Sequence, residues 1–353
     1  MRGGTSRALF FHAADLPPEG AARDRILLRA LGSPDPYGRQ LDGLGGGISS
    51  LSKACIIGPG TRPDADVDYT FAQVEVRRSV VDYKGNCGNC SSAVGPFAID
   101  EHLVPAVEPE TTVRIHNTNT KKLIVAHVPV RDGEAAVEGD FELPGVPGTG
   151  ARIALDFVDP GGAVTGMLLP TGRTRDAIDG VDASLVDATN PVVFVRAKDA
   201  GLAGTESPAD LDKDAALGAR LEKIRAAAAE LMGIAGSAAV PKIALVSPPA
   251  SFTALDGTRY RAAQADVIAR VISMGNCHRA FALTAAMCLA VAARIEGTVV
   301  QEAAGPPGAH DLRLGHPSGV LPIAAEVAAG PTAKRVTVYR TARRLMEGFV
   351  TIP

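Results

Sequence analysis

The chain has 353 residues, with 36 Lys and Arg against 39 Asp and Glu, and a formal net charge of −3. This balance, without a run of like charges, argues against a basic surface for nucleic acid or anionic lipid. A chain of this length is also too long for one typical hydrophobic core, so we expect two domains.

No window approaches 18 uninterrupted apolar residues, and Met1 is followed by polar residues 2–6 rather than by the apolar core of a signal peptide. We therefore expect a cytoplasmic protein that does not enter the membrane. The cysteines are Cys55, Cys87, Cys90, Cys277 and Cys288. Five is an odd and small number, which favours reduced thiols over a disulfide framework.

In the first half, alternation of β-branched or aromatic residues with polar ones predicts strands over 67–76, 112–116, 123–130 and 153–157. The Ala-rich segment of roughly 91–100 is apolar nearly all round, which predicts a helix buried in a core. A turn-rich stretch near 171–182 indicates the linker. We expect an N-terminal domain over 1–172, completed by 343–353, and a C-terminal domain over 173–342.

In the second half, the same alternation predicts strands over 192–195, 243–246, 265–272 and 335–339. A peripheral helix is expected from Ser207, as N-cap before Pro208, to Leu231, with Gly233 ending it. A second helix that is apolar all round is expected over roughly 279–295.

An identical tripeptide precedes each of the two apolar helices. Gly85-Asn86-Cys87 lies before the first and Gly275-Asn276-Cys277 before the second. A three-residue match can arise by chance, but its repetition before two similar helices indicates an internal duplication.

Cys87 lies in a Gly- and Asn-rich turn, residues 86–92, that runs into the first of these helices. Exposed N–H groups and the positive end of the helix dipole suit a carboxylate and lower the pKa of a thiol, so Cys87 is a candidate reactive thiol. The alternative is that Cys87 and Cys90 are small core residues. Their CxxC spacing lacks the second pair that a zinc site needs, so we expect no metal.

Lys53 follows a glycine-rich loop and begins an apolar strand. Partial burial there would lower its pKa towards the range of a general base, although an ordinary surface lysine fits the same pattern. Residues 2–7 supply a guanidinium and two hydroxyls between glycines, which suits carboxylate binding. Residues 273–279 and 316–319 are further polar turns. Motifs for nucleotide binding, phosphoryl transfer or serine hydrolysis do not occur.

Twelve segments, spread in order over nearly the whole chain, resemble the PrpF family, which includes 2-methylaconitate cis-trans isomerases, 4-oxalomesaconate tautomerases and methylitaconate delta-isomerases. They are residues 2–6, 32–35, 40–46, 52–53, 86–89, 116–120, 145–150, 169–172, 186–191, 273–275, 315–319 and 340–344. The resemblance implies a diaminopimelate-epimerase-like α/β (α+β) fold. Its two similar domains each have a curled, mostly antiparallel sheet around a central helix, with the active site between them.

The resemblance also implies a cofactor-independent enzyme in which Lys53 and Cys87 flank the substrate. Cys277 is a second candidate acid–base group, because diaminopimelate epimerases use one thiol from each domain, although the family pattern has no Cys there. The expected substrate contacts are Arg2, Thr5, Ser6, Ser52, Asn86, Gly88, Asn89, Ser273, Met274, His278, Arg279 and Ser318. Family members usually have residues before the Arg-Gly-Gly motif, so we expect either that the first strand is truncated here or that the start at Met1 is late.

The expected activity is a 1,3-allylic proton transfer in 4-oxalomesaconate, 2-methylaconitate, aconitate or a similar acid. In this hypothesis neutral Lys53 removes the proton and two helix N-termini hold the dienolate, while Cys87 returns the proton, shuttles it or lines the site. One alternative is an amino-acid racemase or epimerase that uses Cys87 and Cys277 as opposed thiols. Another is a carboxylate-binding protein without catalysis. A homodimer is the expected assembly.

Overall fold

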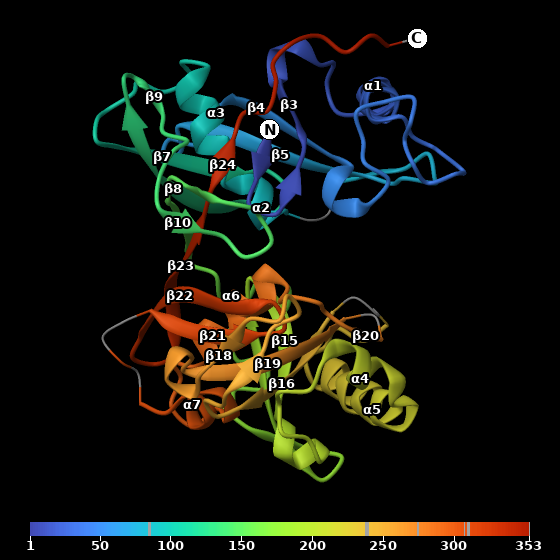
Figure 1. The fold of residues 1–353 in the computed structure, drawn as a ribbon, viewed down its shortest axis with the longest axis vertical. Coiled ribbons are helices and arrows are strands. Elements are labelled where there is room, and N and C mark those ends of the chain that lie inside the picture. Colours follow the sequence, from blue (N-terminus) through green and yellow to red (C-terminus); the bar gives the residue numbers. More distant parts are fainter. Residues whose placement is uncertain (84–85, 237–239, 274, 307, 309–310, 353) are drawn as a thin grey trace. The chain divides into compact units, whose positions relative to one another are not determined.

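The computed structural model describes residues 1–83, 86–236, 240–273, 275–306, 308 and 311–352 (Figure 1). The chain forms two compact units. The first comprises Met1–Val158 with Tyr339–Pro353, and the second comprises Asp159–Val338. The domain boundaries expected from the sequence lie after residues 172 and 342.

The first unit is built on a mixed sheet. Its strands, in spatial order, are β3 (Leu9–His12), β4 (Lys53–Pro59), β5 (Val67–Val74), β7 (Glu110–Asn117), β8 (Lys122–Arg131) and β12 (Ile153–Val158). Only the β3–β4 and β5–β7 pairs of this series are parallel. The short strands are β1 (Arg2–Gly3), β2 (Ser6–Arg7), β6 (Val81–Asp82), β9 (Glu134–Ala135), β10 (Phe141–Glu142), β11 (Thr149–Gly150) and β24 (Ala342–Arg343). β1 pairs with both β2 and β24, so the two ends of the chain meet in one small sheet.

Three α-helices belong to the first unit: α1 (Ala21–Leu31), α2 (Gly88–Ser91) and α3 (Val94–Asp100), together with the short 3-10 turns η1 (Ala13–Asp15) and η2 (Ser49–Leu51). In α3 every residue from Val94 to Ile99 is buried, and the helix contacts β7, β8 and β9. The expected core helix over 91–100 is therefore confirmed. α1 was not expected, because three arginines interrupt an apolar face of only Leu27, Ala30 and Leu31.

The second unit repeats this type of sheet. Its strands, in spatial order, are β13 (Asp176–Ile178), β14 (Val181–Ala188), β15 (Asn190–Arg196), β16 (Lys242–Ser247), β19 (Val267–Ser273), β21 (Leu312–His316), β22 (Gly319–Ala328) and β23 (Thr332–Arg340). The β15–β16 and β19–β21 pairs are parallel. The short strands are β17 (Phe252–Thr253), β18 (Arg259–Tyr260) and β20 (Asn276–Cys277).

The helices of the second unit are α4 (Pro208–Lys213), α5 (Ala215–Leu231), α6 (Leu283–Ala292) and α7 (Val299–Ala304), with the 3-10 turns η3 (Ala197–Ala200) and η4 (Ala262–Gln264). Every residue of α6 from Ala285 to Ala292 is buried. α6 contacts β14 and β15 towards one edge of the sheet and β22 towards the other, so the sheet curls around this helix. The expected α/β class, with mostly antiparallel sheets around buried helices, is confirmed.

The eight strands expected from alternation all form, most of them one to three residues longer or shorter than expected. The helix expected over 207–231 is divided in two. Ser207 caps α4 by accepting a hydrogen bond from the Asp210 N–H, and Asp214 then caps α5 by accepting one from Leu217 at 2.9 Å. The second cap starts a new helix where the sequence pattern predicts a continuous one.

The second Gly-Asn-Cys tripeptide does not open a helix, which corrects the sequence analysis. Asn276 and Cys277 form β20, which folds back on β19, and α6 begins only at Leu283. The first tripeptide does lead directly into α2, although its Gly85 lies outside the described residues. Cys277 pairs with Ile272 in the antiparallel β19–β20 arrangement, so Cys277 is not at a helix N-terminus.

Gly43 allows the loop that precedes Lys53 to pack on the end of α1. A Cβ atom there would lie 2.1 Å from the Gly32 nitrogen. We expect Gly43→Ala to lower the free energy of unfolding by about 1–3 kcal/mol, because rigid backbone must move. Gly218→Ala, in α5 with open space around its Cβ, should instead raise it by about 0.5–1 kcal/mol. Urea unfolding of both variants checks this, and equal effects would contradict it.

Among the described residues, no helix combines the length and apolar character that crossing a bilayer requires.

Candidate functional site

Lys53 is the first residue of β4 and is only 8% exposed. Its Nζ donates a hydrogen bond to Gln73 Oε1 at 2.5 Å and lies 5.0 Å from the centre of the Phe71 ring. Gln73 is the residue opposite Lys53 on β5, and its amide nitrogen donates to the carbonyls of Ser49 and Ser52. These two bonds fix which end of the amide faces the amine. Lys53 is therefore a buried, oriented amine rather than a surface lysine.

Cys87 is the half-buried N-cap residue of α2, and its Sγ accepts a hydrogen bond from the Cys90 N–H at 3.4 Å. The expectation of a lowered thiol pKa is wrong. A side-chain hydrogen bond with Cys90 and burial raise the pKa of Cys87 well above its usual range, and the Lys53 charge opposes them only in part. Since α2 has only four residues, its dipole is small. Cys87 is consequently a protonated thiol at neutral pH, and this thiol lies within electrostatic reach of Lys53.

Two hydroxyl side chains of the β1–β2 hairpin lie at the start of α2, one against Cys87 and one against Asn89. Ser6 Oγ lies 3.9 Å from Cys87 Sγ, and Thr5 Oγ1 accepts a hydrogen bond from Asn89 Nδ2 at 3.1 Å. Arg340, which no sequence argument had marked for a role, donates from Nε to Asn89 Oδ1 at 3.1 Å. The first unit therefore assembles a thiol, two hydroxyls, an amide and a guanidinium in one place. This group and Lys53 constitute the Lys53–Cys87 site.

Four other residues of the first unit that were expected to contact substrate are buried or form hydrogen bonds within the protein. Arg2 Nη1 donates to the carbonyls of Gly4 and Thr341. Ser52 is fully buried, donating to the Val74 carbonyl and accepting from Gln40. Asn86 Oδ1 accepts from Ser91 and Asn117 at 3.4 Å each, and Gly88 is the buried first residue of α2. These side chains hold the loops around the site, and their role as substrate contacts stays a prediction.

Cys277 is only 4% exposed and belongs to the core between the sheet and α4–α5 of the second unit. It lines a small cavity of about 100 Å³ with Leu211, Leu217 and Ile243 among others. Burial raises its pKa to about 11. Its N–H donates to the Asp212 carboxylate at 2.7 Å. These surroundings are those of a packed core thiol.

The remaining expected contacts also lie in the second unit. Ser273 ends β19, and Met274 lies outside the described residues. His278 and Arg279 are exposed, with Arg279 3.8 Å from Asp212. Ser318 Oγ donates to the Arg279 carbonyl at 2.7 Å, which brings the turn 316–319 to this group. The structure thus gathers the expected residues into two sets, one in each unit.

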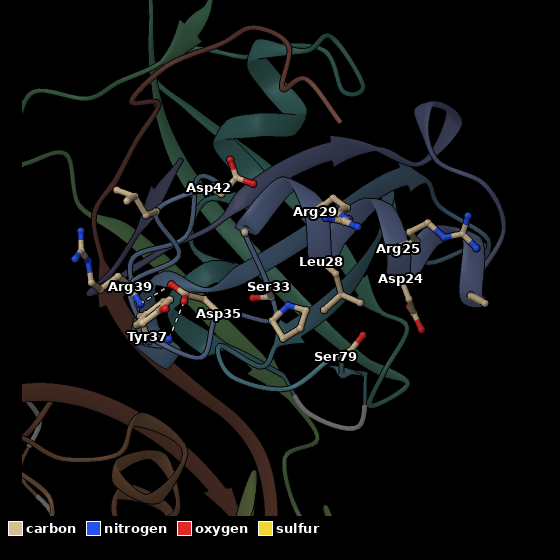
Figure 2. A pocket seen from close by; sticks show the side chains of 14 residues that line it. Asp24, Arg25, Leu28, Arg29, Ser33, Asp35, Tyr37, Arg39, Asp42 and Ser79 are labelled. Carbon is tan, nitrogen blue, oxygen red and sulfur yellow. Dashed lines mark hydrogen bonds between the residues drawn. The ribbon is translucent and has the colours of Figure 1, made fainter. Parts of the chain in front are cut away.

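A cavity of about 1030 Å³ lies elsewhere in the first unit, between α1 and the loop after it (Figure 2). Its lining includes Arg25, Arg29, Asp35 and Tyr37, and none of the expected site residues. Asp35 accepts hydrogen bonds from the backbone of the loop that it stabilises. Within the described part of the chain, no cluster of three or more His, Cys, Asp or Glu residues could hold a metal ion.

Sequence reasoning missed Gln73 and Arg340. Gln73 is a polar position in an alternating strand, and only the register of β4 on β5 reveals that it faces Lys53. Arg340 follows a predicted strand and lies in a matched segment, but its burial depends on contacts with residues about 250 positions away. Both residues are therefore identified only by contacts between segments that are distant in the sequence.

Comparison with known proteins supports the resemblance. The family model described as PrpF protein matches residues 1–353. The chain is 47% identical to 3-methylitaconate isomerase of Eubacterium barkeri, over 100% of this chain and 96% of that protein. It is 42% identical to 4-oxalomesaconate tautomerase of Pseudomonas putida, over 100% and 94%.

The crystal structure of a methylitaconate delta-isomerase superposes with a TM-score of 0.94 at 46% identity, covering 99% of this chain and 94% of that one. The two chains therefore share one fold throughout. With a family model matched over its whole length and relatives far above 30% identity, the chain belongs to the PrpF family.

Proposed function

We propose that this chain, an isomerase of the PrpF family, shifts a carbon–carbon double bond in a small unsaturated di- or tricarboxylate by moving one allylic proton. The observation that carries the proposal is the pairing of a buried amine, Lys53, held in place by Gln73, with a nearby thiol, Cys87, that carries its proton. A base and an acid of this kind are what a 1,3-proton shift requires.

In the proposed first step, the Lys53 amine takes a proton from the carbon next to the double bond. The electrons of the broken C–H bond join the conjugated system and give a dienolate. Gln73 holds the Lys53 Nζ in one position, so the orientation needed for proton transfer is set before substrate binds. The resulting ammonium is a positive charge beside the anion that forms.

In the second step, Cys87 gives its thiol proton to the far carbon of the allylic system. The raised pKa of Cys87 supports this direction, because the thiol enters the reaction carrying a proton. The thiolate that remains takes a proton from solvent and the Lys53 ammonium releases its proton to solvent, which restores both groups. Rotation in the dienolate would account for cis–trans change.

The proposal is tested by incubating purified protein with 3-methylitaconate, 2-methylaconitate, 4-oxalomesaconate and trans-aconitate, and following the vinyl and methyl signals by proton NMR. We expect at least one acid to give a positional or geometric isomer of the same mass. Saturated tricarballylate serves as the negative control. If every unsaturated acid is unchanged under conditions where the protein is folded, the proposed activity is wrong.

Cys277 gives a test of the two-thiol alternative. We expect Cys277→Ala to keep kcat within about threefold of wild type and to lose roughly 1 kcal/mol of stability, because the thiol fills core space. Steady-state kinetics with the best acid of the panel and urea unfolding give the two numbers. A loss of 100-fold or more in a folded variant would require a catalytic role for Cys277.

Location and assembly belong to the same proposal. All five cysteines are outside disulfide bonds. This supports a reducing compartment and hence the cytoplasm. A homodimer stays a prediction, which light scattering on the purified protein checks.

A further inference from the structure

Arg340 is the buried charge of the Lys53–Cys87 site whose role the proposed proton transfer does not use. It is 5% exposed, although guanidinium groups are among the side chains least often buried without a partner. Burial lowers its pKa to about 10, so the group still carries its charge at neutral pH. The side chain lies against Gly4, where an added Cβ would be 3.1 Å from Arg340 Cδ and 2.3 Å from Asn89 Oδ1. The glycine thus allows the guanidinium to lie under the hairpin.

The contacts of Arg340 are all to neutral acceptors. Nε donates to Asn89 Oδ1, and Nη1 donates to its neighbour's carbonyl, Tyr339 O, at 2.7 Å. In the described part of the chain no carboxylate pairs with it, and Cys87 is the only acidic group that interacts with it electrostatically. Arg344, four residues later, contrasts with it by pairing with Asp100, Glu101 and Glu347.

Two hydrogen-bond donors are left over at this place. Arg340 Nη2 donates to no residue in the described ranges. Thr5 Oγ1 accepts from Asn89, so its own hydroxyl proton can be given to another group. Thr5 is exposed and Asn89 is half-buried, so this cluster reaches the surface. A guanidinium and a hydroxyl that both lack an acceptor match the two oxygens of a carboxylate.

We infer that Arg340 is the anion anchor of the site: its guanidinium, helped by the Thr5 hydroxyl, binds one carboxylate of the substrate beside Cys87. An uncompensated buried charge destabilises a fold, and a bound carboxylate removes that cost when substrate is present. Asn89 orients the guanidinium through Nε. The inference deepens the proposed function and rests on it for the identity of the substrate.

The test measures binding of tricarballylate, a saturated tricarboxylate that cannot isomerise, by titration calorimetry to wild type, Arg340→Met and Arg343→Met. Arg343 is exposed on the same segment, so its variant removes the same charge without touching the cluster. We expect Arg340→Met to bind about 10- to 100-fold more weakly and Arg343→Met to stay within about twofold. Thermal unfolding without ligand should show no loss for Arg340→Met, since a similar apolar chain replaces an unpaired charge.

Equal affinity of Arg340→Met and wild type would overturn the inference, as would wild type that shows no saturable binding. If Arg340→Met fails to fold, the Arg340→Lys variant tests the inference instead. Its ammonium group keeps the positive charge but cannot donate hydrogen bonds from two fixed positions as a guanidinium does. That variant should bind several-fold more weakly, and unchanged affinity would reject the anchor. Isomerisation is measured on the same wild-type sample. If Arg340→Met loses binding while wild type isomerises none of the acids, the proposed function fails and the anchor stands.

Discussion

Lys53→Met should lower kcat by about 10²- to 10⁴-fold with the acid that wild type isomerises, because the base is removed while the buried stem beside Phe71 is kept. The KM should change far less, since the amine acts on the reacting carbon. Loss of the amine also removes the positive charge that develops next to the dienolate. Initial rates by NMR or by loss of the conjugated chromophore give both constants.

Lys121→Met is the matched control, because Lys121 lies exposed on the turn between β7 and β8. The control should keep wild-type kcat. If Lys53→Met retains more than a tenth of the wild-type kcat, Lys53 is not the base. Loss of activity in both variants would indicate a general effect of charge.

Cys87→Ala should separate the two proton transfers. We expect product formation to fall by about 10²- to 10⁴-fold while the donor carbon still exchanges its proton with solvent, because Lys53 is intact. Lys53→Met should lose both processes. Proton NMR in deuterium oxide follows exchange and product in one sample. Product formation by Cys87→Ala at the wild-type rate would exclude the thiol as proton donor.

The raised pKa of Cys87 adds a pH dependence to this prediction. A thiol that must start protonated is active below its pKa, and raising that pKa moves the loss of activity to higher pH. In the direction where Cys87 donates, kcat should therefore not fall as pH rises through about 8.5, the value of an ordinary thiol.

The sequence could predict elements that depend on local pattern. Alternation identified eight strands, and the all-apolar segments identified the two buried helices. Prediction from the sequence failed where the same residue pattern is compatible with more than one local structure. Three arginines interrupt the apolar face of α1, so the sequence pattern did not predict that helix. In the second tripeptide, Asn276 and Cys277 pair with β19 as a strand instead of starting a helix.

The candidate site was predictable only in part, for a related reason. Lys53 and Cys87 stand in recognisable motifs, but the state of each depends on contacts and burial that the motif alone does not show. Gln73 reaches Lys53 through strand register, and the thiol pKa of Cys87 is set by Cys90 and burial rather than by a helix dipole. Arg340 joins the site from the other end of the chain. Sequence spacing reveals neither the Gln73 nor the Arg340 contact, whereas Cys90 lies only three residues from Cys87 and is visible in the CxxC spacing.

The most direct test of the proton-transfer account is the position of deuterium in product formed by wild-type protein in deuterium oxide. Removal by Lys53 and return by Cys87 predict close to one deuterium per molecule, on the carbon that was part of the original double bond. Product that holds no solvent deuterium, or that carries it only at other carbons, would contradict the account.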